Sequence, residues 1–353
     1  MEEKKNSGFK ENYLENIKSN YVLQHIFDNI QHNKLLQIVK YNKNIQFRLN
    51  KDINDYKNYN KVIIEIFPIN KYNKNYFIQY EEQEKQYYHL YFNDEKEEKQ
   101  KVYFNDDEYV TKINIIIDGQ ITSVEGLFNG CECIKKINFV KFNRKDINNM
   151  SYMFCGCLNL IELNLNNFNT NNVTDMSHMF HGCSSLEVLN INNFNTSKVT
   201  NMNHMFSDCS SLKELNLNNF NTNNVTDMSS MFFDCSSLIE LNINNFNTNN
   251  VTSMVCMFGH CSSLKDLNHN SFNINNVTSM WRMFSNCSSL ERLNIINFNF
   301  NNLKNMDDIF WRCSSLKKIN INNFNINNIK NKTIAWFILC RCLDEEEDFE
   351  DEN

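Results

Sequence analysis

The sequence predicts an α/β fold: a small α/β N-terminal domain followed by a solenoid with a parallel sheet on one face and short helices on the other. Three observations predict it. A stretch of 26 residues recurs nearly unchanged through most of the 353-residue chain. Each copy contains one strand-like and one helix-like apolar pattern. The roughly one hundred residues before the first copy follow unrelated patterns.

Cysteine gives the register of the repeat. It recurs every 26 residues at Cys131, Cys157, Cys183, Cys209, Cys235, Cys261, Cys287 and Cys313. Self-similarity at this period is typical of arrays in which each unit buries its apolar face only against its neighbours. Stacking eight such coils would place each apolar residue on its counterpart in the next coil.

One copy, residues 183–208, shows how a coil is built. Leu189 and Ile191 alternate with polar residues at the period of a strand. Met202, Met205 and Phe206 follow at the i, i+3, i+4 spacing of a short helix, and Thr200 is placed to act as its N-cap.

The pattern "SSLxxLNINNFNTNNVTxMSxMFxxC" resembles the BspA-like leucine-rich repeat family. The resemblance covers about residues 110–337 and implies a leucine-rich-repeat-like solenoid used for binding, often on cell surfaces. Many members are secreted or lipid-anchored, whereas this chain shows neither signal. A surface adhesin therefore stays one alternative.

Composition divides the chain into four parts. We expect a helical segment at 1–60, a small β-rich region at 61–109, the repeat solenoid with its caps at 110–338 and an acidic tail at 339–353. The strand-like runs of the β-rich region are "KVIIEIF", "NYFIQY" and "YYHLYF". The last coil is capped, in this interpretation, by the segment around Trp336.

The segment at 15–50 suggests two or three helices, because apolar residues recur at helical spacing in "NYVLQHIFDNIQHNKLLQIVK". It is similar to an F-box, the three-helix module that docks substrate adaptors onto a ubiquitin ligase. The resemblance implies a substrate receptor of a ubiquitin ligase, with a ligase adaptor as partner. The alternative is a helical domain with a structural role.

Charge and composition favour a cytoplasmic protein without a nucleic-acid partner. The net charge is −7, but the last ten residues carry eight carboxylates, so the rest of the chain sums to +1 and has no basic stripe. No signal peptide or membrane span is apparent. With seven Gly and one Pro, we expect Asn to supply the left-handed turn positions.

The sequence predicts no enzyme, cofactor or metal. It lacks glycine-rich phosphate loops and the common nucleophile and zinc motifs. The periodic cysteines are interpreted as buried thiols, although the three CxC pairs leave metal binding as an alternative. His178 and His204 share one column near His181, and a polar surface is favoured there over a transition-metal site.

Variable positions are the best guide to a binding face, because a binding solenoid keeps its core and varies its exposed residues. Mixed charge after the first Leu of each repeat suits a protein partner. The preferred partner-binding residues, of types enriched at interface hot spots, are Phe233, Trp281, Arg282, Trp311 and Arg312. The alternative is that the Trp rings merely cover the last coils. The sequence thus predicts a non-enzymatic protein-interaction scaffold.

Overall fold

The structure is a computed structural model, and it describes residues 17–28, 42–50, 58, 60–69, 75–104, 108–119, 121–142, 144–268, 272–294 and 302–320. Two compact units are present, Met1–Lys61 and Val62–Asn353. The acidic tail, the proposed C-terminal cap and the CxC pair at 340–342 lie outside the described residues.

Two helices are described in the first unit. They are α1 (Asn20–Asp28) and α3 (Lys43–Leu49). Asn42 caps α3, because its side-chain oxygen accepts a hydrogen bond from the backbone N–H of Ile45 at 3.0 Å. The Arg48 side chain joins the two helices by donating to Asn20 Oδ1 at 2.9 Å. Helices are therefore confirmed within 15–50, whereas the F-box resemblance stays a prediction.

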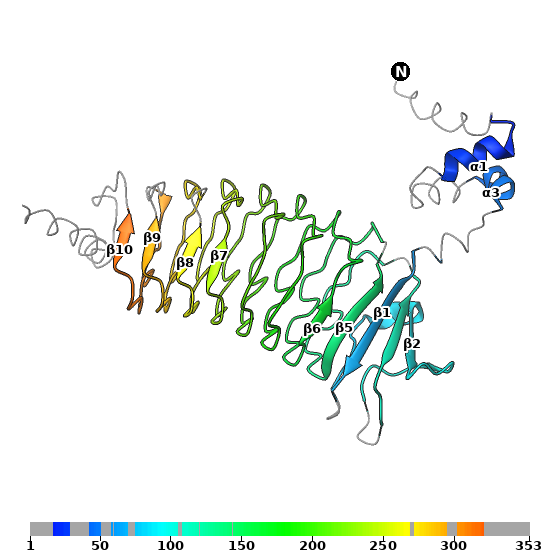
Figure 1. The fold of residues 1–353 in the computed structure, drawn as a ribbon, viewed down its shortest axis with the longest axis horizontal. Helices are drawn as coiled ribbons and strands as arrows, with labels where there is room; N and C mark the ends of the chain where they lie inside the picture. The colour runs from blue at the N-terminus through cyan, green and yellow to red at the C-terminus, as the bar shows by residue number, and fades with distance from the viewer. Residues whose placement is uncertain are drawn as a thin grey trace, which may run out of the picture. The chain divides into compact units, whose positions relative to one another are not determined.

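The second unit begins with an antiparallel sheet that continues into the repeats. Its six strands have the order β3-β2-β4-β1-β5-β6. They are β1 (Val62–Pro68), β2 (Tyr88–Phe92), β3 (Glu98–Lys99), β4 (Ile113–Ile117), β5 (Ile134–Lys141) and β6 (Glu162–Asn164), with the short 3-10 helix η1 (Glu82–Tyr87) before β2. Strand β1 lies antiparallel to both β4 and β5, while β5 and β6 are parallel. The early strand β1 therefore covers the edge that the first coil would otherwise expose (Figure 1).

Two of the three predicted N-terminal strands are confirmed, as β1 and β2. The prediction for "NYFIQY" is wrong, because this run makes only an isolated bridge between Tyr76 and Tyr103. Phe77 and Ile78 are both fully buried, so burial does not alternate there as it would in a half-exposed strand.

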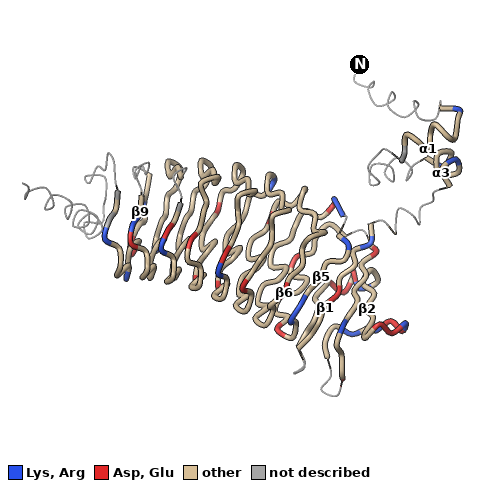
Figure 2. Tube along the Cα trace, in the orientation of Figure 1, with Lys and Arg blue, Asp and Glu red and all other residues tan. Residues whose placement is uncertain are grey.

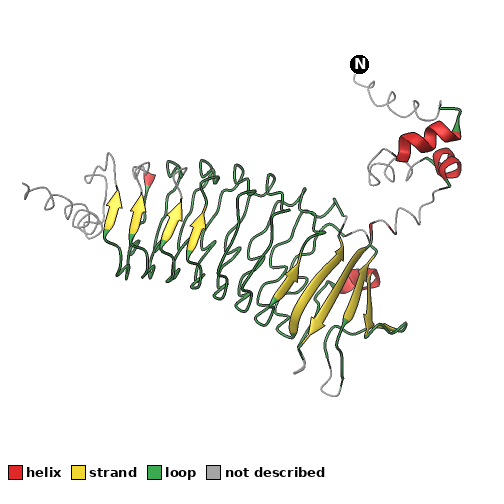
Figure 3. Ribbon diagram, viewed as in Figure 1, coloured by secondary structure: helices red, strands yellow, loops and turns green. Residues whose placement is uncertain are grey.

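The repeats stack as successive coils along one axis (Figure 1). Parallel bridges join equivalent residues 26 apart, and one such ladder runs through Ser123, Asn149, Asp175, Asn201, Asp227, Ser253, Ser279 and Asn305. Short parallel strands form β7 (Glu240–Asn242), β8 (Asp266–Asn268), β9 (Arg292–Asn294) and β10 (Lys318–Asn320). The coils between β6 and β7 follow the same path as loops (Figure 3).

The predicted short helices of the repeat are wrong in the described coils. The segment that contains Met202, Met205 and Phe206 consists of consecutive turns. Two left-handed residues, His204 and Asp208, interrupt it and exclude a right-handed helix. The backbone N–H of Phe206 bonds across to the Met231 carbonyl of the next coil at 2.9 Å, instead of four residues back. We call this part of each coil the turn segment. It runs from the residue after the first Met to the periodic Cys, which is 203–209 in this coil.

Thr200 is not a helix cap either. Its N–H and hydroxyl both donate to the Thr174 carbonyl oxygen of the preceding coil, at 2.9 and 3.2 Å. The same threonine ladder continues through Thr226, Thr252 and Thr278. Thr200 therefore ties coils together.

Like packs on like in the core, as the 26-residue period predicts. The rings of Phe128, Phe154, Phe180, Phe206, Phe232, Phe258, Phe284 and Phe310 stack in sequence, with neighbouring centroids 5.4–5.9 Å apart. A single apolar cluster extends from Val62 to Ile319. The core of the antiparallel sheet and the core of the coils are thus continuous.

Asparagine shapes the coils differently from the prediction. The left-handed residues of the described repeats are of many types, including Tyr152, His178, Ser230 and Cys256. Asn acts instead through its side chain: Asn219 Nδ2 donates to the carbonyls of Ile191 and Phe194 in the preceding coil, at 3.2 and 2.8 Å. Other Asn side chains accept the N–H two residues on and form turns of the kind expected for Asx residues.

Candidate functional site

The turn segments of the C-terminal coils bring four of the five predicted site residues together. The Arg282 guanidinium lies over the Trp281 ring at 4.6 Å and over the Trp311 ring at 5.6 Å. Arg312 covers the same Trp311 ring at 4.3 Å. Trp281, Arg282, Trp311 and Arg312 therefore form one cluster of alternating rings and guanidinium groups, here called the Trp–Arg cluster.

An ion pair fixes part of this cluster. Arg282 Nε and Nη2 both lie 3.1 Å from Asp308 Oδ2. Asp308 belongs to the coil that also carries Trp311, so the ion pair and the cation–π contacts join the same two coils. The Trp311 side chain still exposes 42% of its surface. The cluster is thus ordered before any partner arrives.

Phe233, the fifth predicted residue, lies apart from the Trp–Arg cluster. Its ring packs against His260 with a centroid separation of 5.0 Å. It also covers Gly259, where an added Cβ would meet Phe233 Cδ2 at 3.0 Å. A residue larger than Gly at 259 would displace this ring, so Gly259 positions Phe233.

A groove of about 710 Å³ is lined by Trp311 and Arg312 of the cluster and by His260, the residue against which Phe233 packs. Four of its lining residues occupy one column in successive coils, namely Asp234, His260, Asn286 and Arg312. All four have left-handed backbone, with φ between 52° and 65°. Trp311 closes one side of the groove, next to Arg312. Asp234, His260 and Asn286 are not among the site residues predicted from the sequence.

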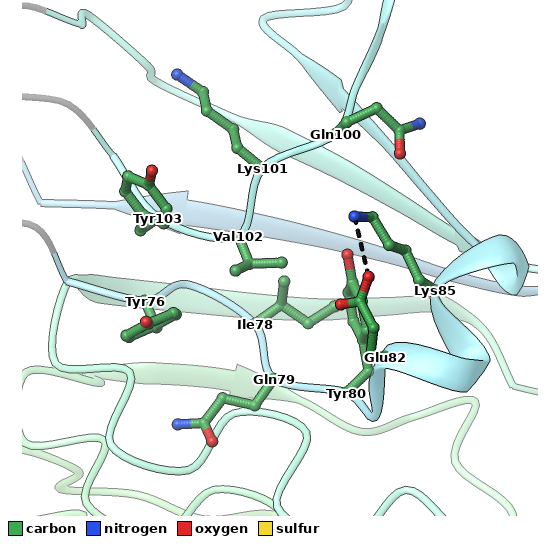
Figure 4. Close-up of a pocket in the computed structure, with 10 residues that line it drawn as sticks. All are labelled: Tyr76, Ile78, Gln79, Tyr80, Glu82, Lys85, Gln100, Lys101, Val102 and Tyr103. Carbon is green, nitrogen blue, oxygen red and sulfur yellow. Dashed lines mark hydrogen bonds and ion pairs between the residues drawn. The ribbon is translucent and has the colours of Figure 1, made fainter.

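A second hollow, of about 470 Å³, lies at the N-terminal sheet (Figure 4). Tyr76 and Tyr103 stand at one end with ring centroids 6.1 Å apart, and both are substantially exposed. Glu82 and Lys85 form an ion pair of 3.3 Å at the other end. Sequence reasoning missed this hollow because it assigned Tyr76 to a regular strand.

His178 and His204 stack face to face in adjacent coils, with ring centroids 4.4 Å apart. Tyr152 continues the stack on the other side of His178, also at 4.4 Å. Burial, and then the nearby His204 and His181, lower the pKa of His178 to about 4. The described structure gives neither Nδ1 atom of the stacked pair a hydrogen-bond partner. Neutral imidazoles are the favoured state of this stack.

The interpretation of the periodic cysteines as buried thiols is confirmed, because every described cysteine is free and the eight of the column are buried. Each from Cys157 to Cys313 donates its S–H to a Phe carbonyl of the preceding coil. Burial raises the pKa of Cys209 to about 12. Such thiols do not form nucleophilic thiolates at neutral pH.

Two kinds of feature are absent from the described ranges. No group of three or more His, Cys, Asp or Glu side chains there is arranged to hold a metal ion. In the same ranges, no helix has the length and apolar character that crossing a bilayer requires.

Three comparisons relate the chain to known proteins. A family model described as "Mycoplasma protein of unknown function, DUF285" matches residues 122–239 and 236–340. No curated protein matches the chain. Among solved structures, a leucine-rich repeat protein from Bacteroides ovatus is 18% identical, with a TM-score of 0.32, over 58% of this chain and 60% of that chain.

A TLR13–ssRNA13 complex is a further similar structure. It is 22% identical, with a TM-score of 0.25, over 57% of this chain and 31% of that chain. The chain thus matches less than two thirds of the length of either solved structure.

Proposed function

From the premise that this chain belongs to the family described as "Mycoplasma protein of unknown function, DUF285", we propose that it is a non-enzymatic protein-interaction scaffold. In this proposal residues 110–338 form a leucine-rich-repeat-like solenoid of the BspA-like type. The partner is a protein, and it contacts the turn segments of the C-terminal coils. The observation that carries the proposal is the Trp–Arg cluster.

The composition of the cluster supports a protein partner. Tryptophan and arginine are the residues most enriched among interface hot spots, where rigid rings supply contact area and guanidinium groups supply directed donors. Trp281 and Trp311 are already held by Arg282, which is itself paired with Asp308. A partner would therefore order few side chains on binding, which lowers the entropic cost of association.

The stacked coils add a second favourable property. Backbone hydrogen bonds run between neighbouring turn segments, for example from Asn286 N–H to the Trp311 carbonyl at 2.7 Å. These bonds fix the spacing of residues on the surface. Lys and Arg are interspersed with Asp and Glu along the stack (Figure 2), and mixed charge of this kind gives specificity for one protein surface.

The experiment is affinity capture from cells with the full-length chain, followed by direct binding measurements on each recovered protein. We expect one specific partner to be lost when Trp281, Arg282, Trp311 and Arg312 are all replaced by Ala. Alanine scanning of interface hot spots predicts a cost of more than about 2 kcal/mol, and hence a Kd weakened at least about thirtyfold.

A matched control variant carries four alanine substitutions at charged positions just after the first Leu of a repeat, namely Lys213, Lys265, Arg292 and Lys317. It should retain the partner. Retention by the Trp–Arg variant and loss by the control would refute the location of the site. A partner that depends on residues 1–60 alone, such as a ligase adaptor, would instead favour the F-box interpretation.

A further inference from the structure

The groove beside the Trp–Arg cluster has a ladder-like wall that spans four coils. Asp234, His260, Asn286 and Arg312 lie at the same position of successive coils. Neighbouring coils in a parallel arrangement are separated by about 4.8 Å, so the first and last of these residues are about 14 Å apart. The groove is therefore an elongated feature that follows the stacking axis.

One end of the groove is acidic and lacks a strong cationic partner. Asp234 forms no ion pair within the described ranges. Partial burial, and then the neighbouring Asp208 carboxylate, raise the pKa of Asp234. Both effects disfavour the charged carboxylate. A cationic group placed here would stabilise that charge and so offset them. The nearby His260, through its Coulombic effect, and a side-chain hydrogen bond with Ser236 oppose this rise in part.

The other end is basic. The Arg312 guanidinium lies over the Trp311 ring, with its carbon 4.3 Å from the ring centroid, and it has no ion pair among the described residues. Arg282, one coil earlier, differs because its guanidinium already forms an ion pair with Asp308. Arg312 thus offers its N–H donors to an incoming carboxylate, which a guanidinium can bind through two parallel hydrogen bonds.

Polar groups line the groove between these ends. Asn286 Nδ2 and His260 Nε2 are within hydrogen-bond distance of one another at 2.9 Å. The hydroxyl of Ser288 donates to the Ser262 carbonyl at 3.3 Å, and that of Ser314 donates to the Ser288 carbonyl at 3.5 Å. Since their hydrogens are used, the hydroxyl oxygens remain able to accept N–H groups from a ligand.

We propose that this groove binds an extended peptide segment that carries one basic and one acidic residue four positions apart. Residues i and i+4 of an extended chain lie on the same face and about 13 Å apart, which matches the distance between Asp234 and Arg312. The basic side chain pairs with Asp234, the acidic one with Arg312, and the side chain between them lies over His260 and Asn286. This inference rests on the proposed function, because it specifies the chemistry of the partner.

The probes are blocked synthetic peptides measured by isothermal titration calorimetry with the full-length chain. Lys-Ala-Ser-Ala-Glu and Glu-Ala-Ser-Ala-Lys test the two chain directions, and at least one should bind. Lys-Ala-Ser-Glu and Glu-Ala-Ser-Lys place their charges on opposite faces, so we expect them to bind at least tenfold more weakly. Absence of binding by both five-residue peptides at millimolar concentration would overturn the proposal.

Charge variants identify the groove as the site. Asp234→Asn and Arg312→Asn should each weaken the bound peptide at least tenfold, whereas Arg292→Ala, which removes a charge from β9, should not. Asn is compatible with this backbone, because Asn286 has φ 59° in the same column. The double variant Asp234→Arg/Arg312→Asp should prefer the opposite peptide direction. Unchanged affinity and direction in these variants would overturn the proposal.

The peptide result and the capture result are separable. If the captured partner requires the Trp–Arg cluster but neither peptide binds, the inference fails and the proposed function stands. If the peptides bind as expected but no captured partner depends on the cluster, the proposed function fails at its stated site. Equal binding of all four peptides would indicate nonspecific electrostatic attraction and contradict the inference.

Discussion

The Cys209 thiol donates a hydrogen bond to the backbone carbonyl oxygen of Phe180 at 3.1 Å, across the boundary between two coils. That oxygen already accepts the N–H of Cys183 in its own coil. One carbonyl therefore closes a turn within a coil and holds the next coil in register. The repetition of this relationship along the column explains why cysteine, rather than another small apolar residue, marks the period.

Stability should fall at alkaline pH because of these thiols. Burial raises the pKa of Cys209 and Cys261 to about 12, above the ordinary value of 9.0 that the unfolded chain restores. Their contribution is complete below about pH 9 and is lost as pH rises towards 12, by up to about 1.4 kcal/mol per pH unit for each thiol. Urea unfolding at pH 8 and pH 10.5 measures the loss. The double variant Cys209→Ala/Cys261→Ala should show a shallower decline, and an identical decline would contradict the account.

Phe232→Ala should destabilise the stack by about 3–5 kcal/mol. The ring is fully buried and stacks between Phe206 and Phe258 at 5.7 and 5.6 Å, so its removal leaves a cavity. Lys213→Ala is the control, because this exposed side chain makes only a surface ion pair with Glu187 and should change stability by less than about 1 kcal/mol. Similar denaturant midpoints for the two variants would show that the Phe column is not core.

Two adjacent asparagines allow a matched test of coil-to-coil hydrogen bonding. Asn219→Ala removes donors to the carbonyls of Ile191 and Phe194, and we expect it to cost about 1–3 kcal/mol. Asn218→Ala changes the same chemical group at the neighbouring position, which is also exposed, and should cost less than about 0.5 kcal/mol. Thermal unfolding of both proteins provides the measurement. A larger loss for Asn218→Ala would refute the assigned role.

The histidine stack should make the protein less stable in mild acid. Burial and neighbouring imidazoles lower the pKa of His178 to about 4, below the ordinary 6.5, and they lower the pKa of His204 as well. Their contribution is present above pH 6.5 and is lost as pH falls towards 4. Asp175, Asp208 and Asp227 oppose this effect in part.

Nuclear magnetic resonance titration of the imidazole protons measures these pKa values directly. The variant His178→Asn/His204→Asn keeps residues that tolerate left-handed backbone and should lose less stability between pH 6.5 and 4.5. A His178 pKa near 6.5 would contradict the packing described here.

The period of the sequence predicted the core because it depends on side-chain columns alone. The column of Phe206 and the column of Cys209 were both evident at 26-residue spacing. The helical face was predicted wrongly for a physical reason: Met202, Met205 and Phe206 point inward from tight turns at the same spacing as from a helix. Only the left-handed residues and the inter-coil hydrogen bonds distinguish the turns from a helix. The left-handed positions are occupied by many residue types and the hydrogen bonds join backbone atoms, so the sequence does not reveal either.

The site was predictable in part. Trp281, Arg282, Trp311 and Arg312 stood out as large non-repeat residues, and the structure places them in one cluster. The groove could not be predicted, because Asp234 and Arg312 share a column only when the turn segments are correctly folded. The insertion of β1 between β4 and β5 was also beyond local pattern, since it joins residues more than forty positions apart in sequence.

Hydrogen–deuterium exchange with and without the captured partner tests the central claim most directly. The account predicts slowed exchange in two segments 26 residues apart, 281–287 and 307–313, which contain the Trp–Arg cluster and its ion pair. Exchange in β7–β10 and in the N-terminal sheet should stay unchanged. Protection confined to the strands, or to residues 62–104, would contradict the claim that the turn segments of the C-terminal coils form the binding surface.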